Sequence, residues 1–589
     1  MEEQMKKTNL RHGFIGLCLL LFVFVAASVS AAGVSLTFDH FYDHEELSNA
    51  LKALKEAYPQ FMTLEKLGTS YQGREIWGVI LNNPQTGPAK HKSGFYIDGN
   101  IHGNEIQGTE VALYAIWYLL TNHGKTEYAT RLLDERAFYV IPSMNPDARD
   151  YFINKPTTYR TGLIPRDDDR DGLLDEDSPD DLNGDGVITM MRKKDPNGRF
   201  KAHPTDKRIM ISVLPGEKGE YSYLGEEGID NDGDGFLNED DLGGYDMNRN
   251  YGYNWQPPYV QMGAGDYPFC FPEMRATRDF LMDNPNIMGA QCFHNYGGMI
   301  LRGPGAMNLG EYPRADIQVY DYIGKKGENI LPGYEYLIVH KDLYVVYGGS
   351  IDFLFCTLGI FTFTNELDID LFNIHSLEQI ADEGEKTPEE RQQEEMLQEF
   401  YTMFFYDNVM LGETHIDWEP YDHPLYGEIE IGGVTKFGRR VPPLFQLPDT
   451  CHRNAAFCFF HADQLPLLEF DTVKVKKTAS DLYQIDICIK NTRITPTIST
   501  QAKQKKLHRL DRLHIEGKNI KLLAAGNITD LYRGTTDKIE TQGNIIWIEK
   551  GIPGFGQTNL RLLVKGKGDV RLAYDSLKGG YYSKNISLK

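Results

Sequence analysis

The chain has 589 residues, which is too long for one ordinary hydrophobic core and indicates two or three domains. Hydrophobic residues make up 41% of the chain and aromatic residues 12%, which excludes wholesale disorder. The 84 Asp and Glu outnumber the 61 Lys and Arg, and the resulting net charge of −23 argues against a general nucleic-acid-binding protein.

The first 31 residues have the pattern of an export signal. Lys6, Lys7 and Arg11 precede the apolar stretch Phe14–Ala27, which is too short to span a bilayer, and small residues follow it as at a cleavage site. We therefore expect an exported protein, whether secreted, periplasmic or on the cell surface, that loses residues 1–31. No later stretch is long and apolar enough for a membrane helix, so no membrane span is expected after signal removal.

The region after the signal alternates between helical and strand patterns. Apolar residues recur at helical spacing in two segments, and short apolar runs that end at Gly or Asn indicate strands between them. Such alternation predicts an α/β domain with its functional site at the strand ends. The predicted helices are residues 45–57, 105–120 and 389–407, and the predicted strands are residues 62–67, 76–81, 95–98 and 137–141.

From residue 426 onward the pattern changes to the period-two alternation of β-strands, which predicts a small β-sandwich. The alternating segments are residues 428–431, 473–477, 485–489, 520–523 and 545–548. The charge changes as well, because residues 466–589 hold 22 Lys and Arg against 12 Asp and Glu. We therefore expect a separate β-rich domain at residues 423–589.

Three residues of metal-ligand type follow predicted strands. His102 and Glu105 lie three residues apart directly after a buried strand, and His294 ends the apolar run 287–293. Two such residues alone can equally be a surface histidine and a helix-capping glutamate. A catalytic zinc ion takes three protein ligands and leaves one position open, so the third candidate favours a zinc site. Since His294 is distant in sequence, only the fold can bring the three together.

Glu366 stands at the end of another alternating strand, 361–367. It is either an exposed edge residue or a general base that accepts a proton from the attacking water at a zinc site.

Six motifs in this order resemble the zinc metallocarboxypeptidases of the carboxypeptidase A type, over residues 42–407. The resemblance implies a mixed, eight-stranded sheet flanked by helices, one catalytic Zn²⁺ held by His102, Glu105 and His294, and a catalytic domain at residues 32–422. The motifs are Gly68-Thr-Ser-Tyr-Gln-Gly-Arg74, Gly99-Asn-Ile-His-Gly-Asn-Glu105, Asn145-Pro-Asp147, Tyr245-Asp-Met-Asn-Arg-Asn250, His294-Asn-Tyr296, and Tyr344-Val-Val-Tyr-Gly-Gly-Ser-Ile-Asp352 followed by Glu366.

The resemblance also implies roles for residues around the zinc. Glu366 corresponds to the general base, and Arg160 falls at the spacing of the arginine that stabilises the oxyanion. Asn248 and Arg249 resemble the pair that holds the terminal carboxylate of the substrate. Tyr344 resembles the family's mobile tyrosine, and Tyr347 is the alternative.

The same resemblance bears on the choice of substrate. Ile351 follows the Gly-Gly-Ser turn and lines the pocket for the departing side chain, and Gly305 is the other pocket position. Neither residue carries a charge, so an apolar C-terminal residue is expected. Arg302 is the alternative, because an inward guanidinium would favour an acidic terminus. Asn104 stands where some members carry an arginine for extended substrates, so the upstream subsites are expected to differ.

The insertion at residues 161–247 is acidic and longer than the family's usual connection. It contains the calcium-loop pattern D-x-[DN]-x-D-G three times. No copy has glutamate at the twelfth position, where Asp241 is the nearest equivalent. The alternative is a solvated acidic loop, and the three copies favour structural Ca²⁺. The expected ligands are Asp167, Asp169, Asp171, Asp181, Asn183, Asp185, Asp230, Asp232, Asp234 and Asp241.

The sequence thus predicts an exported zinc carboxypeptidase that acts on the C-termini of peptides or proteins. One alternative is a zinc amidase or peptidase of cell-wall peptides, and another is a calcium-dependent surface-binding protein with an inactive enzyme domain. Of the seven cysteines, six remain after removal of residues 1–31, and these are too few for a disulfide framework in so large a protein. Cys451 and Cys458 are either a disulfide pair, ligands of a second metal with His452, or unpaired and buried.

Overall fold

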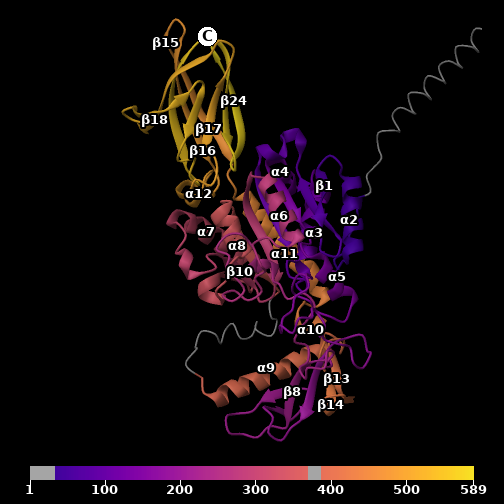
Figure 1. The fold of residues 1–589 in the computed structure, drawn as a ribbon. Helices are drawn as coiled ribbons and strands as arrows, with labels where there is room; N and C mark the ends of the chain where they lie inside the picture. The colour runs from indigo at the N-terminus through magenta and orange to yellow at the C-terminus, as the bar shows by residue number, and fades with distance from the viewer. Residues whose placement is uncertain (1–32, 369–385) are drawn as a thin grey trace, which may run out of the picture.

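The computed structural model describes residues 33–368 and 386–589, so the expected export signal lies outside the described residues. Figure 1 shows a C-terminal β-sandwich at one end, an α/β body in the middle and a smaller sheet at the other end. Across the described residues, no helix combines the length and the apolar character needed to cross a bilayer.

The middle body is built on a mixed sheet of eight strands in the order β1-β2-β4-β3-β9-β12-β10-β11. The central strands β4, β3, β9 and β12 run parallel to one another, so their carboxyl ends share one edge. This confirms the predicted fold of the catalytic domain. The strands are β1 (Met62–Thr69), β2 (Glu75–Leu81), β3 (Ser93–Gly99), β4 (Arg136–Ile141), β9 (Ile287–Asn295), β10 (Met299–Arg302), β11 (Glu335–Ile338) and β12 (Phe361–Leu367).

Helices cover both faces of this sheet, which is why β3, β4 and β9 are buried along their whole length. The larger core lies under α2 (His44–Ala57), α3 (Gln107–Asn122), α4 (Glu127–Glu135), α7 (Arg314–Ile330) and α11 (Leu447–Asp463). On the other face, α6 (Pro272–Asp283) packs against a second core. Capping residues define the N-termini of two of these helices. Asp43 and Glu46 form a capping box at α2, and Thr126 caps α4.

The smaller sheet has six strands in the order β13-β14-β5-β8-β6-β7. Four neighbouring strands, β5, β8, β6 and β7, come from the insertion, and β14 pairs with β5 although more than 230 residues separate them. The helix α9 (Pro388–Asn408) packs against this sheet through Met403 and Tyr406 rather than against the catalytic sheet. The strands are β5 (Met190–Lys194), β6 (Phe200–Ala202), β7 (Met210–Ser212), β8 (Tyr221–Glu226), β13 (His415–His423) and β14 (Gly427–Val434).

The C-terminal body is the predicted β-sandwich of two antiparallel, five-stranded sheets, β15-β16-β22-β18-β19 and β20-β21-β17-β23-β24. Inward-facing Ile, Leu and Val side chains of both sheets form a single core. The strands are β15 (Leu468–Ala479), β16 (Leu482–Asn491), β17 (Asp511–Glu516), β18 (Lys521–Asp530), β19 (Thr535–Ile539), β20 (Thr541–Gln542), β21 (Ile545–Ile548), β22 (Gln557–Lys565), β23 (Gly568–Ser576) and β24 (Gly580–Leu588), with α12 (Thr500–Lys505) between β16 and β17.

The sandwich begins at Leu468 in the structure, whereas the change of pattern places the boundary at residue 423. The difference arises because β14 belongs to the smaller sheet and α11 packs on α3. Cys451 and Cys458 lie buried in α11, and neither forms a disulfide. The fully buried Arg136 donates to the carbonyl oxygens of Ala462, Leu465 and Pro466, where the chain enters the sandwich.

Candidate active site

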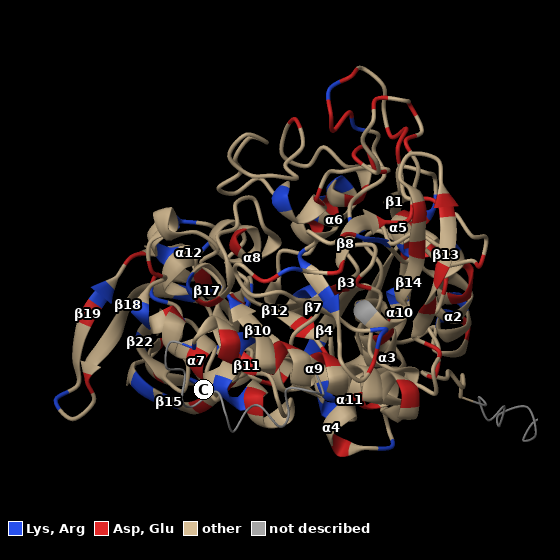
Figure 2. Ribbon diagram, turned by 90° about the horizontal axis from the view of Figure 1, so that it is seen from below, with Lys and Arg blue, Asp and Glu red and all other residues tan. Residues whose placement is uncertain are grey.

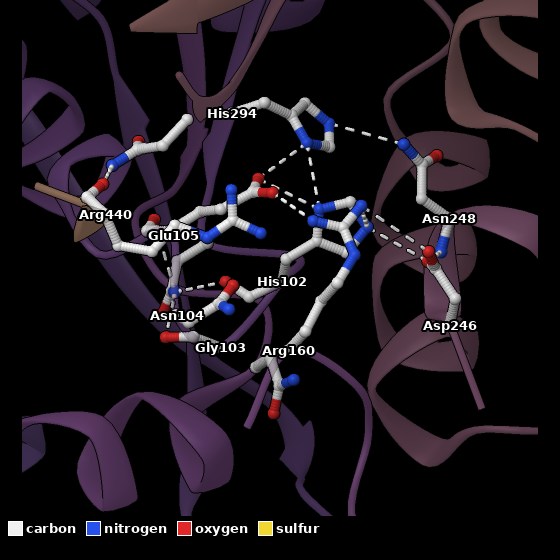
Figure 3. Close-up of polar contacts among 12 residues, drawn as sticks. His102, Gly103, Asn104, Glu105, Arg160, Asp246, Asn248, His294 and Arg440 are labelled. Atoms are coloured by element: carbon white, nitrogen blue, oxygen red, sulfur yellow. Dashed lines mark hydrogen bonds and ion pairs between the residues drawn. The ribbon is translucent and has the colours of Figure 1, made fainter. Parts of the chain in front are cut away.

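Three side chains of metal-ligand type meet at the carboxyl edge of the central sheet (Figure 3). His102 and Glu105 lie in the turn between β3 and α3, and His294 lies near the end of the neighbouring strand β9. Glu105 Oε2 is 2.9 Å from His102 Nδ1 and 2.8 Å from His294 Nδ1, and the two Nδ1 atoms are 3.1 Å apart. The three side chains are at most 4% exposed. The fold therefore brings together the three residues that the sequence predicts.

Glycine is required in the turn that carries two of these residues. A Cβ atom at Gly103 would lie 2.1 Å from the Cβ of Ala148 and 2.6 Å from the carbonyl oxygen of Tyr159. The N–H of Gly103 donates to the carbonyl oxygen of Arg160 at 2.9 Å. The turn thus fixes both metal-ligand side chains and the segment that presents Arg160.

Two of the motifs that carry no zinc ligand support this arrangement. Asp147, from the Asn145-Pro-Asp147 motif, accepts hydrogen bonds from Ser70 Oγ at 2.6 Å and Arg74 Nη1 at 2.9 Å. Asn145 caps α5 (Pro146–Asn154) through the N–H of Ala148. These residues therefore join β1 and β2 to the segment that leads to Arg160.

Two imidazole nitrogens and a carboxylate oxygen facing one another in a buried site form a ligand set of catalytic zinc. His102 Nε2 lies 3.0 Å from Asp246 Oδ1, and such a carboxylate fixes the orientation of a ligating imidazole. Burial opposes ionisation of Asp246, but nearby His102 and Arg249 hold its pKa well below its usual range. The residues thus fit zinc, which when bound supplies Lewis acidity that polarises a carbonyl and activates water.

Glu366 and Arg160 border the same site. Glu366, on β12, stands in register with His294 on β9. Burial raises the pKa of Glu366 to about 7, against the opposing effect of His294. Arg160 contacts Glu105, and its Nη2 lies 3.1 Å from His102 Nε2 and 3.6 Å from Asp246 Oδ2. A carboxyl group and a guanidinium thus lie next to the zinc triad, defined as His102, Glu105 and His294.

An apolar pocket adjoins the zinc triad. Leu301, Val339, Val346 and Ile351 line it and pack into one cluster. Asn248, Arg249 and Tyr344 line the same pocket. Asn248 Oδ1 accepts from the N–H of Ser350 at 2.9 Å, and the Arg249 guanidinium carbon lies 5.8 Å from the centre of the Tyr344 ring.

The alternatives that the sequence left open take other positions. Arg302 is only 4% exposed, and it donates to Tyr336 Oη at 2.8 Å and to the carbonyl oxygen of Gly303 at 2.7 Å. Gly305 packs against Asp352 and donates its N–H to that carboxylate. The backbone N–H of Tyr347 donates to Gln261 Oε1 at 3.0 Å. Among the described residues lining the pocket, none of these three is present.

The acidic loops lie on the insertion, and Figure 2 shows acidic residues gathered on loops that project beyond α5 and α6. Three groups of carboxylates come within 4.8 Å of one another: Asp167, Asp169 and Asp240; Asp169, Asp171 and Glu176; and Asp230, Asp232 and Asp234. In the second loop, Asp181 and Asp185 accept hydrogen bonds from the loop's own backbone. Asp240, which is not among the expected ligands, lies with Asp167 and Asp169 of the first loop, and Asp241 accepts from the N–H of Leu242.

The zinc carboxypeptidase family matches residues 47–390, which is more than half of the chain. The chain belongs to this family. A second match, to a domain of unknown function, covers residues 467–587 and coincides with the β-sandwich. The zinc carboxypeptidase domain therefore contains an intact zinc triad, as the sequence predicts.

Curated relatives share short segments with this chain. Carboxypeptidase D of Homo sapiens is 31% identical over 134 residues, which are 23% of this chain and 10% of that protein. Carboxypeptidase M of Mus musculus is 34% identical over 125 residues, 20% of this chain and 27% of that protein. An inactive metallocarboxypeptidase of Saccharomyces cerevisiae is 30% identical over 116 residues, 19% of this chain and 26% of that protein. The chain thus spans about a quarter or less of these relatives.

Solved structures are similar at low identity. Bovine thrombin-activatable fibrinolysis inhibitor, in complex with tick carboxypeptidase inhibitor, gives a TM-score of 0.43 at 16% identity over 72% of this chain and 97% of that chain. Carboxypeptidase A from Helicoverpa armigera gives 0.39 at 19% identity over 60% of this chain and 71% of that chain.

Sequence reasoning missed two residues of the site. Asp246 lies inside the Tyr245–Asn250 motif, two residues before Asn248. Its place in this motif is the feature of the sequence that could have identified it as a site residue. Arg440 lies far outside the matched region, and its carbonyl oxygen accepts a hydrogen bond from Asn295 Nδ2 at 3.2 Å (Figure 3). No pattern in the sequence links Arg440 to the zinc triad.

Proposed function

We propose that the protein is an exported, zinc-dependent carboxypeptidase that hydrolyses the C-terminal peptide bond of peptides or proteins and releases apolar residues. The observation that carries the proposal is one pocket, lined by zinc ligands and Glu366, that also contains Arg249 and an apolar lining. This combination suits a substrate with a free carboxylate and an apolar terminal side chain.

Substrate binding follows from the residues of this pocket. The planar guanidinium of Arg249 can bind a carboxylate with two parallel hydrogen bonds, and Asn248 adds a donor. The terminal side chain then enters the space among Leu301, Val346 and Ile351. Tyr344, whose ring is 47% exposed beside Arg249, covers the bound residue.

The chemical step uses the groups around the triad. Glu366 takes a proton from the attacking water and later gives it to the leaving amine, a role suited to a carboxyl whose pKa is near 7. Arg160 stabilises the negative charge that grows on the scissile carbonyl oxygen. Asp246 keeps the His102 ring in its ligating orientation through the contact at Nε2.

Matched peptides with free and amidated C-termini test this function. The free peptides should be cleaved at the last bond, and the amidated ones should be poor substrates because Arg249 loses its partner. Equal cleavage of both would favour the amidase alternative. Cleavage of neither by zinc-loaded protein would favour the surface-binding protein with an inactive enzyme domain.

Peptides that differ only in the last residue test the apolar preference. Phe should give a higher kcat/KM than Lys or Glu, since an unpaired charge in an apolar pocket is costly. Lys as the best terminus would contradict the apolar pocket, and Glu as the best terminus would return Arg302 to consideration.

Export is part of the proposal because residues 1–31 carry a basic segment, a short apolar segment and small residues in the order of a signal. N-terminal sequencing of the protein recovered outside the cytoplasm should begin near residue 32. Recovery of uncleaved protein in the cytoplasm alone would contradict it.

Calcium binding to the acidic loops completes the proposal. Loops 167–178 and 230–241 both carry Asp at positions 1, 3, 5 and 11, Gly at position 6 and Glu at position 10, and an antiparallel bridge joins Asp177 to Asp240. Asp240 is 0% exposed; its Oδ1 accepts from the N–H of Asp168, and its Oδ2 has no hydrogen-bond partner among the described residues. The carboxylate oxygens of Asp240, Asp167 and Asp169 lie within 4.8 Å of one another. Carboxylates so close together repel one another unless a cation or a proton lies between them.

The loops connect to the zinc site through the base of the insertion. Gly162 donates its N–H to the carbonyl oxygen of Tyr245 at 3.0 Å. Gly162 lies two residues after Arg160, and Tyr245 directly precedes Asp246. Calcium should therefore support the positions of both residues. Titration of zinc-loaded protein with Ca²⁺ by calorimetry tests the proposal, and heat equal to that of buffer alone would contradict it.

A further inference from the structure

A second cavity lies beside the zinc triad, between the catalytic domain and the smaller sheet. It has a volume of about 310 Å³. Asn104 and Tyr296 line it from the catalytic side, and Ile188 and Val434 line it from the side of the smaller sheet. Asn104 lies between His102 and Glu105, and Tyr296 lies two residues after His294. The cavity therefore borders the metal site at a place separate from the pocket for the terminal side chain.

Arg440 reaches into this region from outside the family match. It follows the short helix α10 (Lys436–Arg439), and its backbone is anchored by Asn295, the residue after His294. Figure 3 shows its side chain extending toward Glu105 and His102. The guanidinium carbon lies 5.9 Å from the centre of the Tyr296 ring, and its charge acts on Glu366.

The charges that line the cavity leave Arg440 available for a ligand. Among the described residues, its guanidinium makes no hydrogen bond or ion pair, and it both lines the cavity and faces Tyr296. Lys436 also lines the cavity, but its ammonium donates to the carbonyl oxygens of Phe152 and Lys155. Glu226 is the one carboxylate of the lining, so cations outnumber anions in this cavity of a chain with net charge −23.

The positions of the two cavities indicate where the peptide upstream of the scissile bond binds. The departing residue fills the apolar pocket, so the peptide upstream of the scissile bond must leave the zinc triad on another side. The cavity beside Asn104 and Tyr296 is the hollow that borders the triad there. The Asn104 side chain is too short to cross it, and its Nδ2 donates to the carbonyl oxygen of Thr158 at 3.3 Å.

We propose that Arg440 is a substrate-binding residue that pairs with the carboxylate of an acidic side chain upstream of the scissile bond. The proposal rests on the proposed carboxypeptidase function. A guanidinium matches a carboxylate with two parallel hydrogen bonds, which a neutral amide side chain cannot reproduce. Arg440 therefore makes the protein selective for acidic peptides, although the net negative charge of the protein repels such peptides.

Peptides that end in the same Phe and carry Glu, Gln or Lys at the second or third residue from the C-terminus test this role. The unchanged protein should prefer Glu over Gln by about tenfold in kcat/KM at one of these positions, mainly through KM, the scale of one charge-assisted hydrogen bond. Arg440→Gln should reduce this ratio to about one. Arg440→Lys should keep part of it. Arg453→Gln, on the exposed surface of α11, is the matched control and should leave the ratio of kcat/KM for the Glu and Gln peptides unchanged.

Binding measurements separate this proposal from the proposed function. Calorimetry of the Glu and Gln peptides with the Glu366→Gln protein, with and without Arg440→Gln, reads affinity without turnover. Loss of the Glu preference only when Arg440 is replaced supports the proposal. A preference that survives Arg440→Gln, or equal affinity for Glu and Gln in the unchanged protein, overturns it. Failure of the unchanged protein to cleave any peptide would instead contradict the proposed function, and the binding data would still decide the role of Arg440.

Discussion

The zinc triad and the acidic loops both gather side chains suited to a cation, but the fold holds them in opposite ways. The zinc triad stands on neighbouring parallel strand ends and is at most 4% exposed. In the loops, Asp185 and Asp234 are exposed and Asp181 and Asp230 are half-buried, and their oxygens already accept hydrogen bonds from the loop backbone. A site fixed by a packed sheet is formed before its metal arrives, whereas a loop site needs the ion to fix it.

Replacing a ligand of the zinc triad should have the largest effect. In His102→Ala, two ligands cannot hold a catalytic zinc, so metal content and turnover should both be abolished. The fold should persist because β3 and α3 are held by the core. Elemental analysis, kcat/KM and circular dichroism check this, with Asp181→Ala as a control that should keep its zinc. Full turnover by His102→Ala would mean that the site is misplaced.

The groups beside the triad should affect chemistry more than binding. Glu366→Gln and Arg160→Ala should each lower kcat by about 10²–10³, the usual effect of losing one group that acts in the transition state, with little change in KM. Steady-state kinetics on a Phe-ending peptide give both constants. If only KM changes in a variant, the replaced residue does not act in the chemical step.

Asp246→Asn should have a smaller effect, because it removes neither a zinc ligand nor a group that acts directly on the substrate. Loss of such a carboxylate typically lowers zinc affinity or activity by about 10–100-fold. Competition with a zinc chelator measures the affinity directly. Unchanged affinity and unchanged kcat together would show that the contact at His102 Nε2 does not position the ring.

The smallest effect is expected in the loops and should leave zinc in place. Calcium at 100 times its Kd should stabilise the unchanged protein by about 2.7 kcal/mol, and Asp240→Asn should lose most of this gain. Denaturation of zinc-loaded protein with and without Ca²⁺ measures it, and Asp279→Asn, on the exposed surface of α6, is the control. Equal calcium stabilisation of both variants would exclude Asp240 as a ligand.

The sequence predicts the parts of the molecule in which local pattern and site coincide. β3 is an uninterrupted buried run, and the turn after it carries His102 and Glu105, so both the strand and its ligands follow from the residues. The sandwich strands β15, β16 and β21 contain the predicted alternating segments 473–477, 485–489 and 545–548. In each case a period of two or a motif spacing carries the information.

The remaining features depend on contacts between distant segments. The alternation at residues 428–431 predicts a strand but cannot show that it pairs with β5 rather than with the sandwich. Asp240 lies with Asp167 and Asp169 of the other loop because an antiparallel bridge joins Asp177 to Asp240, which a single loop pattern does not reveal. Arg440 follows β14 of the smaller sheet, yet it lines the cavity beside Asn104 and Tyr296.

The packing of α11 defines the shortest chain that can fold as this enzyme. The family match ends at residue 390, yet the helix that closes the sheet face over α3 begins at Leu447. A protein shortened to residue 390 or 422 would expose that face and leave the buried guanidinium of Arg136 without the carbonyl oxygens of Ala462, Leu465 and Pro466. A truncated enzyme should therefore retain everything through Pro466, and one that ends earlier should be recovered as insoluble protein.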